Sequence, residues 1–96
     1  MEARLHRDVK EIVGALMRVL DGGEVSESEL ADLDFEAEGE LETAVEEAYL
    51  RLEAFAQALD IRLADPDIDR RMRAELQTCL DAIVEICDRQ EAVRKH

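Results

Sequence analysis

Carboxylates are the residues of this chain most able to do chemistry, since 25 Asp and Glu stand against 12 Lys and Arg in 96 residues. Asp65, Asp67 and Asp69 have the D-x-D-x-D spacing that opens the calcium-binding loop of an EF-hand. Such a loop also needs Gly at its sixth position and Glu at its twelfth, and this chain has Arg70 and Leu76 there. No Glu-x-x-His pair of a di-metal helical bundle occurs. We therefore expect no metal and no other cofactor.

Two cysteines and two histidines could act as nucleophiles or general bases. Cys79 and Cys87 are eight residues apart on one predicted helix, roughly 12 Å at about 1.5 Å per residue, which is too far for a disulfide. We interpret both as buried thiols in a reducing cytoplasm. His6 and His96 lie near the two ends, and no phosphate-binding loop or nucleophile motif is present. We expect a protein that is not an enzyme, with a carboxylate metal-dependent enzyme as a third hypothesis.

The acidic residues are concentrated in one segment. From Asp21 to Leu50 there are twelve carboxylates and no Lys or Arg, so this segment holds most of the net charge of −13. Some of these acids suit the first turn of a helix, where they interact favourably with the helix dipole. We interpret the others as an acidic surface for a basic protein partner, with a solvated polar surface as the alternative. The predicted partner-binding residues are Asp32, Asp34, Glu36, Glu38, Glu42 and Glu46.

The same charge excludes two kinds of partner. A strongly negative surface repels the phosphates of nucleic acids and the anionic lipids of the cytoplasmic membrane face. No apolar run approaches the roughly 20 residues that a membrane-spanning helix needs, and the first ten residues lack the pattern of a signal peptide. We therefore expect a cytoplasmic protein that binds neither nucleic acid nor membrane.

Three stretches have apolar residues spaced three and four apart, the pattern of a buried helix face. They predict helices over about residues 2–20, 40–63 and 66–89, with residue 59 as the alternative end of the central helix and a frayed tail over 90–96. The predicted core positions are Leu5, Val9, Ile12, Leu16 and Val19 in the first helix, Leu41, Val45, Ala48, Leu52, Phe55 and Leu59 in the central one, and Ile68, Met72, Leu76, Cys79, Ile83 and Ile86 in the last. The residues expected to widen these faces are Val13, Met17 and Leu20, then Ala44, Tyr49, Ala56 and Leu63, then Leu80 and Cys87.

The segment between the first two long helices contains a helix start signal. Ser26 and Glu29 fit the S-x-x-E capping box, in which each side chain bonds a backbone N–H of the first turn. Val25 and Leu30 have the positions of a hydrophobic staple around the same cap. We expect a short helix at about 27–33, joined to the central helix by a loop.

Turn residues mark where two of the long helices stop and start. Asp21-Gly22-Gly23 ends the first helix, with a Gly in the left-handed conformation after it. Asp65 and Pro66 suit the N-cap and the first residue of the last helix.

The central helix has a second, smaller apolar face. At about 100° per residue, Leu50 points about 180° away from Leu41. A helix that is apolar on two sides is covered on both. Either the short helix 27–33 covers this back face, or a second copy of the protein does. The predicted oligomer face consists of Leu50, Ala54, Ala58 and Ile61.

The sequence therefore predicts a single all-α domain over residues 1–96. We expect a small up-and-down bundle of three long helices, with one short capped helix between the first and the second. The leading functional hypothesis is a non-catalytic acidic module that binds another protein, with a homodimer through the back face as one form of it. The alternative is an inhibitor of the immunity or antitoxin type, whose acidic segment masks a basic partner such as a nuclease.

Overall fold

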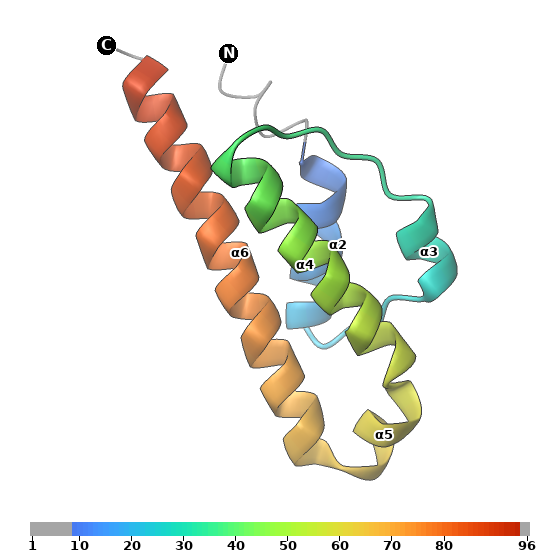
Figure 1. Ribbon diagram of the computed structural model, residues 1–96. Helices are drawn as coiled ribbons and strands as arrows, with labels where there is room; N and C mark the ends of the chain where they lie inside the picture. The colour runs from blue at the N-terminus through green and yellow to red at the C-terminus, as the bar shows by residue number, and fades with distance from the viewer. Residues whose placement is uncertain (1–8, 95–96) are drawn as a thin grey trace.

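The computed structural model describes residues 9–94 of the chain, with side chains as far as Gln90. Its helices are α2 Lys10–Leu20, α3 Glu27–Ala31, α4 Glu40–Gln57, α5 Leu59–Ala64 and α6 Pro66–Arg94. Figure 1 shows α2, α4 and α6 packed together, with α3 beside α4, and α5 at the turn between α4 and α6. The described residues contain no strand. The predicted all-α bundle, with one short helix between the first two long ones, is confirmed.

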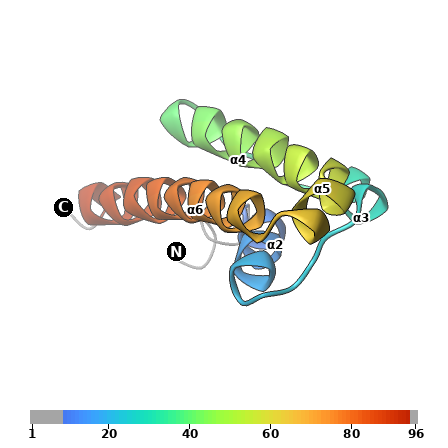
Figure 2. The same cartoon turned by 90° about the horizontal axis from the view of Figure 1, so that it is seen from below.

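The three long helices do not strictly alternate in direction. At one end of the bundle, Arg73 of α6 donates a 2.5 Å hydrogen bond to the carbonyl oxygen of Val19, near the end of α2. At the other end, Arg89 of α6 pairs at 3.1 Å with Glu40, the first residue of α4. Helices α2 and α4 are therefore both antiparallel to α6 and parallel to each other. The connection through α3 returns the chain to the end where α2 begins (Figure 1). Figure 2 shows α4 and α6 side by side, joined through α5.

Helix α2 ends where the sequence predicts. Gly22 has a φ of +97°, a left-handed backbone conformation that residues other than Gly rarely adopt. The N–H of Gly22 donates to the Val19 carbonyl at 3.1 Å, and the N–H of Gly23 donates to the Arg18 carbonyl at 2.9 Å. This double contact is a Schellman motif, which satisfies the last carbonyls of the helix. The predicted start of this helix at residue 2, and Leu5 with it, lie outside the described residues.

The short helix α3 has the predicted cap and is two residues shorter than predicted. The Glu29 N–H donates to the Ser26 hydroxyl oxygen at 3.1 Å, and the Ser26 N–H donates to the Glu29 carboxylate at 3.0 Å. Val25 and Leu30 are both buried beside this cap. The helix is held against α4 by the Tyr49 hydroxyl, which donates to the Leu30 carbonyl at 3.2 Å.

The prediction of one unbroken central helix over 40–63 is wrong. The backbone leaves helical geometry at Ala58, with φ −93° and ψ 17°, and α5 begins at the next residue. Residues after this break no longer continue the buried face of α4, so Leu63 is 74% exposed and Leu59 is 39% exposed. Arg62 takes the inward position instead.

Helix α6 begins as predicted and extends further than predicted. The Asp65 carboxylate accepts hydrogen bonds from the N–H groups of Asp67 and Ile68 at 3.0 and 3.4 Å, as an N-cap does. The helix continues to Arg94, five residues beyond the predicted end at 89. Residues 90–94 contain no Gly or Pro to stop it.

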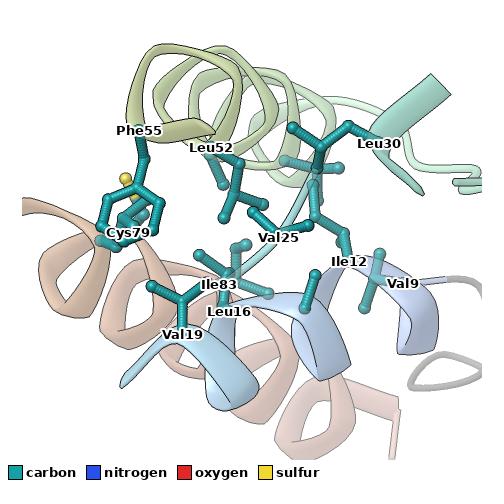
Figure 3. Packing of buried hydrophobic residues seen from close by; sticks show 14 of the residues in the cluster. Val9, Ile12, Leu16, Val19, Val25, Leu30, Leu52, Phe55, Cys79 and Ile83 are labelled. Atoms are coloured by element: carbon teal, nitrogen blue, oxygen red, sulfur yellow. The ribbon is translucent and has the colours of Figure 1, made fainter. Parts of the chain in front are cut away.

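The core is formed by the three predicted faces, and Figure 3 shows many of its side chains meeting between α2, α4 and α6. Phe55 is its largest fully buried side chain. Met17, which the sequence places in the core, is 57% exposed. The buried residues of the three long helices are Ile12, Ala15, Leu16 and Val19, then Leu41, Val45, Ala48, Leu52 and Phe55, then Leu76, Cys79, Ile83, Ile86 and Cys87.

Candidate functional site

The six carboxylates predicted to bind a partner all lie on the surface. Asp32, Asp34, Glu36 and Glu38 belong to the connection between α3 and α4, and Glu42 and Glu46 to the first turns of α4. All six side chains are exposed. We call these six residues the acidic face.

Four of the six residues surround one groove at the start of α4. Glu36, Glu38, Glu42 and Glu46 line a groove of about 560 Å³, together with Phe35, Ala37, Leu41 and Gln90. The apolar members come from the connection and from α4, and Leu41 is almost fully buried beneath them. Gln90 comes from the last turns of α6. Carboxylates and apolar side chains thus line the same groove.

The other two residues of the acidic face lie near α2, outside this groove. Asp32 lines a second groove of about 380 Å³ against α2. Asp34 lies near α2 as well, since its backbone N–H donates to the Glu11 carboxylate at 3.1 Å. The six predicted residues are therefore neighbours along the chain, but only four of them share a groove.

Other acids of the same segment are already paired with bases. Glu29 contacts Arg18 at 2.8 Å, and Glu40 contacts Arg89 at 3.1 Å. Glu47 contacts Arg51 at 2.7 Å. By contrast, the residues of the acidic face form no ion pair with any described part of the chain. Their charge is therefore not neutralised by the described residues, which is the property a basic partner would require.

The structure also contains a charged cluster that sequence reasoning missed. The side chain of Arg62 is 1% exposed, and its guanidinium contacts Glu24 at 2.7 Å and Asp69 at 2.8 Å. Arg73 contacts the same two carboxylates at 3.0 and 2.8 Å. We call Glu24, Arg62, Asp69 and Arg73 the charge clamp. The break at Ala58, which turns Arg62 inward, has no counterpart in the apolar spacing, so that spacing gives no signal of the clamp.

Arg62 is held on several sides. Its Nε donates to the Phe55 carbonyl at 3.0 Å, and its guanidinium carbon lies 3.4 Å from the centroid of the Phe55 ring. Arg73 lies over the same ring at 4.9 Å. A guanidinium on an aromatic face is stabilised by the ring electrons as well as by its hydrogen bonds. The clamp thus fixes α5 to the loop after α2 and to the start of α6.

The clamp lowers the pKa of both its carboxyl groups. The hydrogen bond from Arg62 is the main cause for Glu24. For Asp69 the main cause is the hydrogen bond from Arg73, followed by that from Arg62. Each bond favours the ionised carboxylate. The hydrogen bonds within the charge clamp satisfy its buried polar atoms, because no buried polar side-chain atom of the described residues lacks a hydrogen-bond partner.

The predicted oligomer face is largely exposed, and the break between α4 and α5 divides it. Leu50 is 61% exposed and Ile61 is 57% exposed. Ala54 is exposed as well, while Ala58 is half-buried at the break between α4 and α5. The hypothesis that the short helix covers this face is wrong for Leu50 and Ile61. Helix α3 packs instead beside Tyr49, through Leu30.

Reactive groups and metal ligands are not brought together in the described residues. Cys79 and Cys87 are 7% and 1% exposed in the core, as predicted, and burial raises the pKa of the Cys79 thiol. Among the side chains that the structure describes, those of residues 9–90, no three His, Cys, Asp or Glu are placed to hold a metal ion. No helix in this range is long and apolar enough to cross a membrane. His6 and His96 lie outside the described residues.

Comparisons of the chain with protein-family models, with curated proteins and with solved structures gave no significant match.

Proposed function

We propose that this protein acts without catalysis, by binding another protein through the acidic face. One observation carries the proposal: four exposed carboxylates, none of them in an ion pair with a described residue, line a groove together with the half-buried Phe35 and Ala37. A Lys or Arg side chain could pack its aliphatic stem on these two residues and place its charge among the carboxylates. The expected partner is therefore a protein segment with basic residues next to apolar ones.

We also propose that the protein works in the cytoplasm. The thiols of Cys79 and Cys87 support this location, because both are packed in the core and free thiols persist in a reducing compartment.

An inhibitor of the immunity or antitoxin type is the second candidate, and the same groove supports it. A nuclease has a cationic active site because it binds phosphates, and the acidic face could cover such a site. Complementary charge would speed the association of the two proteins, and added salt would slow it. A nuclease-type toxin encoded next to this protein would support this candidate, and a purified complex whose association rate is indifferent to salt would argue against it.

The test uses two fluorescent peptides of equal positive charge, one alternating Lys with Leu and the other alternating Lys with Ser. Binding is followed by fluorescence anisotropy. We expect the Lys/Leu peptide to bind more tightly, because only its side chains can pack on the apolar residues of the groove. Affinity for both peptides should fall as salt is added, since screening weakens the attraction.

Two variants with the same change in charge separate the groove from the overall charge. The groove variant is Glu36→Gln, Glu38→Gln, Glu42→Gln and Glu46→Gln. The control variant replaces four exposed carboxylates elsewhere, Asp60→Asn, Asp81→Asn, Glu85→Gln and Asp88→Asn. We expect the groove variant to lose at least about tenfold in affinity for the Lys/Leu peptide, about 1.4 kcal/mol, and the control to lose much less. Equal losses would mean that net charge alone attracts the peptide, and the proposal would be wrong.

A further inference from the structure

The connection between α3 and α4 has the side-chain pattern of a β-strand. Along residues 33–38, which we call the connecting segment, exposed acids alternate with half-buried apolar residues. The apolar side chains pack against the core, and the ring centroids of Phe35 and Tyr49 are 5.8 Å apart. A period of two residues is typical of extended backbone with one face on a core. The exposed members are Asp34, Glu36 and Glu38, and the half-buried ones are Leu33, Phe35 and Ala37.

The backbone of the connecting segment has no partner strand. No backbone N–H or C=O group of residues 35–38 forms a hydrogen bond with the described part of the chain. In a β-sheet such groups bond to a neighbouring strand, and residues 9–94 contain no strand that could supply these bonds. Figure 1 shows the segment drawn out between α3 and the start of α4. It therefore presents an unpaired strand edge, the feature to which an added strand binds.

One edge of the connecting segment faces the groove of the acidic face. The N–H of Asp34 donates to the Glu11 carboxylate of α2 at 3.1 Å, so the edge that includes this N–H faces α2. Successive N–H groups of an extended chain point to opposite edges, and those of Phe35 and Ala37 therefore point away from α2. The groove borders the segment on that side, because its other described lining residues belong to α4 and α6 and not to α2.

Charge determines which kind of strand can pair with this edge. A second copy that offered its own connecting segment would place acids directly opposite Glu36 and Glu38, and like charges in that position destabilise a strand pair. A segment with Lys or Arg at every second position places opposite charges there, which stabilises the pair. Its intervening residues then face the bundle, where apolar side chains can pack beside Phe35 and Ala37 in the groove.

We propose that an extended basic segment of the partner protein adds to the connecting segment as an antiparallel strand. This inference rests on the proposed function, because it describes how the partner binds at the acidic face. Residues directly opposite each other in an antiparallel pair point to the same face, and alternate pairs exchange both backbone hydrogen bonds. The apolar residues of the partner therefore bond through their backbone to Phe35 and Ala37. Its basic residues point outward, beside Glu36 and Glu38.

N-methylated peptides test the backbone pairing. The peptide that alternates Lys with Leu is compared with two modified forms, one N-methylated at its Leu residues and the other at an equal number of Lys residues. Each N-methyl group removes one backbone donor and leaves the charge unchanged. We expect methylation at Leu to weaken binding at least about tenfold more than methylation at Lys, because only the Leu amides face the connecting segment. Fluorescence anisotropy measures the three affinities.

Amide hydrogen exchange gives a second measurement, on the protein itself. NMR follows the exchange rate of each backbone N–H with and without the unmodified peptide. We expect the N–H groups of Phe35 and Ala37 to exchange at least about tenfold more slowly in the complex, because the added strand accepts hydrogen bonds from them. The N–H of Glu36 points to the other edge and serves as the internal control, so its exchange rate should change much less.

Two results would overturn the strand pairing. One is a peptide methylated at Leu that binds as tightly as the peptide methylated at Lys, or more tightly. The other is a bound peptide that leaves the exchange rates of Phe35 and Ala37 unchanged. In both cases the proposed function still holds if the unmodified peptide binds and the groove variant weakens its binding. If the unmodified peptide does not bind at all, the proposed function is wrong, and the strand pairing with it.

Discussion

Burying an arginine costs desolvation free energy, which close partners must offset. Arg62 has such partners in two carboxylates, a backbone carbonyl and the face of an aromatic ring. Glu24 and Asp69 remain partly exposed, at 46% and 26%. Water therefore solvates part of each carboxylate, and the stabilisation by the charge clamp is smaller than that of a fully buried ion pair.

The charge clamp predicts a specific response to acid. The pKa values of Glu24 and Asp69 are lower in the folded chain than in the unfolded one. The unfolded chain therefore takes up more protons as the pH falls, and the contribution of the clamp to stability is lost. The contribution should be fully present at neutral pH and should decline below about pH 5, as the pH approaches and passes the lowered pKa values.

Urea unfolding checks this response. It is measured from about pH 7 to about pH 3 on the wild type and on a variant with Glu24→Gln and Asp69→Asn. The variant should be less stable at neutral pH. The difference in the free energy of unfolding between the two proteins should narrow as the pH falls, because acid protonates the two wild-type carboxylates. Comparing the two proteins cancels the effect of acid on the many other carboxylates. If the difference in the free energy of unfolding stays constant with pH, the two carboxylates of the charge clamp do not cause the loss of stability in acid.

At the scale of single elements, the two shortest helices depend on different forces. Helix α3 has a start signal in its own sequence, and the capping box forms as that signal requires. Helix α5 has no side chain capping its first turn, and Arg62 holds it through Glu24, Asp69 and the Phe55 carbonyl. Local sequence therefore specifies α3, whereas α5 is held by contacts outside its own residues, with Phe55 and Asp69 seven residues away and Glu24 38 residues away.

Loss of the α3 cap should be measurable as a loss of stability. A Ser26→Ala substitution removes the hydroxyl that accepts the Glu29 N–H and should lower the free energy of unfolding by about 1 kcal/mol. Ser28→Ala is the matched control, since Ser28 is an exposed residue within the same helix and Ala favours the helical interior. Chemical denaturation of both variants gives the comparison. Equal effects of the two substitutions would mean that the cap contributes nothing.

Charge is unevenly spread over the whole molecule. The acidic segment crosses from the loop after α2, along α3 and its connection, to the start of α4 (Figure 1). The end of the bundle at α5 is close to neutral by comparison. The groove of the acidic face, at the start of α4, thus lies at the opposite end of the bundle from α5 (Figure 1).

The acidic face should reduce the stability of the folded chain, because like charges held close together repel one another. Replacing two of its members, Asp34→Asn and Glu36→Gln, should leave the free energy of unfolding unchanged or raise it by up to about 0.5 kcal/mol. Urea melts at low and high salt measure the effect, which should shrink as salt screens the repulsion. A clear loss of stability would show that these carboxylates have structural partners and would weaken the proposed function.

The sequence by itself determined the helical class, the three long helices and most of the core, because each depends on apolar spacing within one segment. The caps at Ser26 and Asp65 were equally predictable, since a cap is complete within a few residues. Leu63 and Met17 were assigned to the core incorrectly, because spacing identifies a possible buried face but not its partner. Only the tertiary structure decided the break at Ala58, the parallel course of α2 and α4, and the burial of Arg62. These features depend on Glu24, Phe55 and Asp69 meeting in space, which no local pattern in the sequence records.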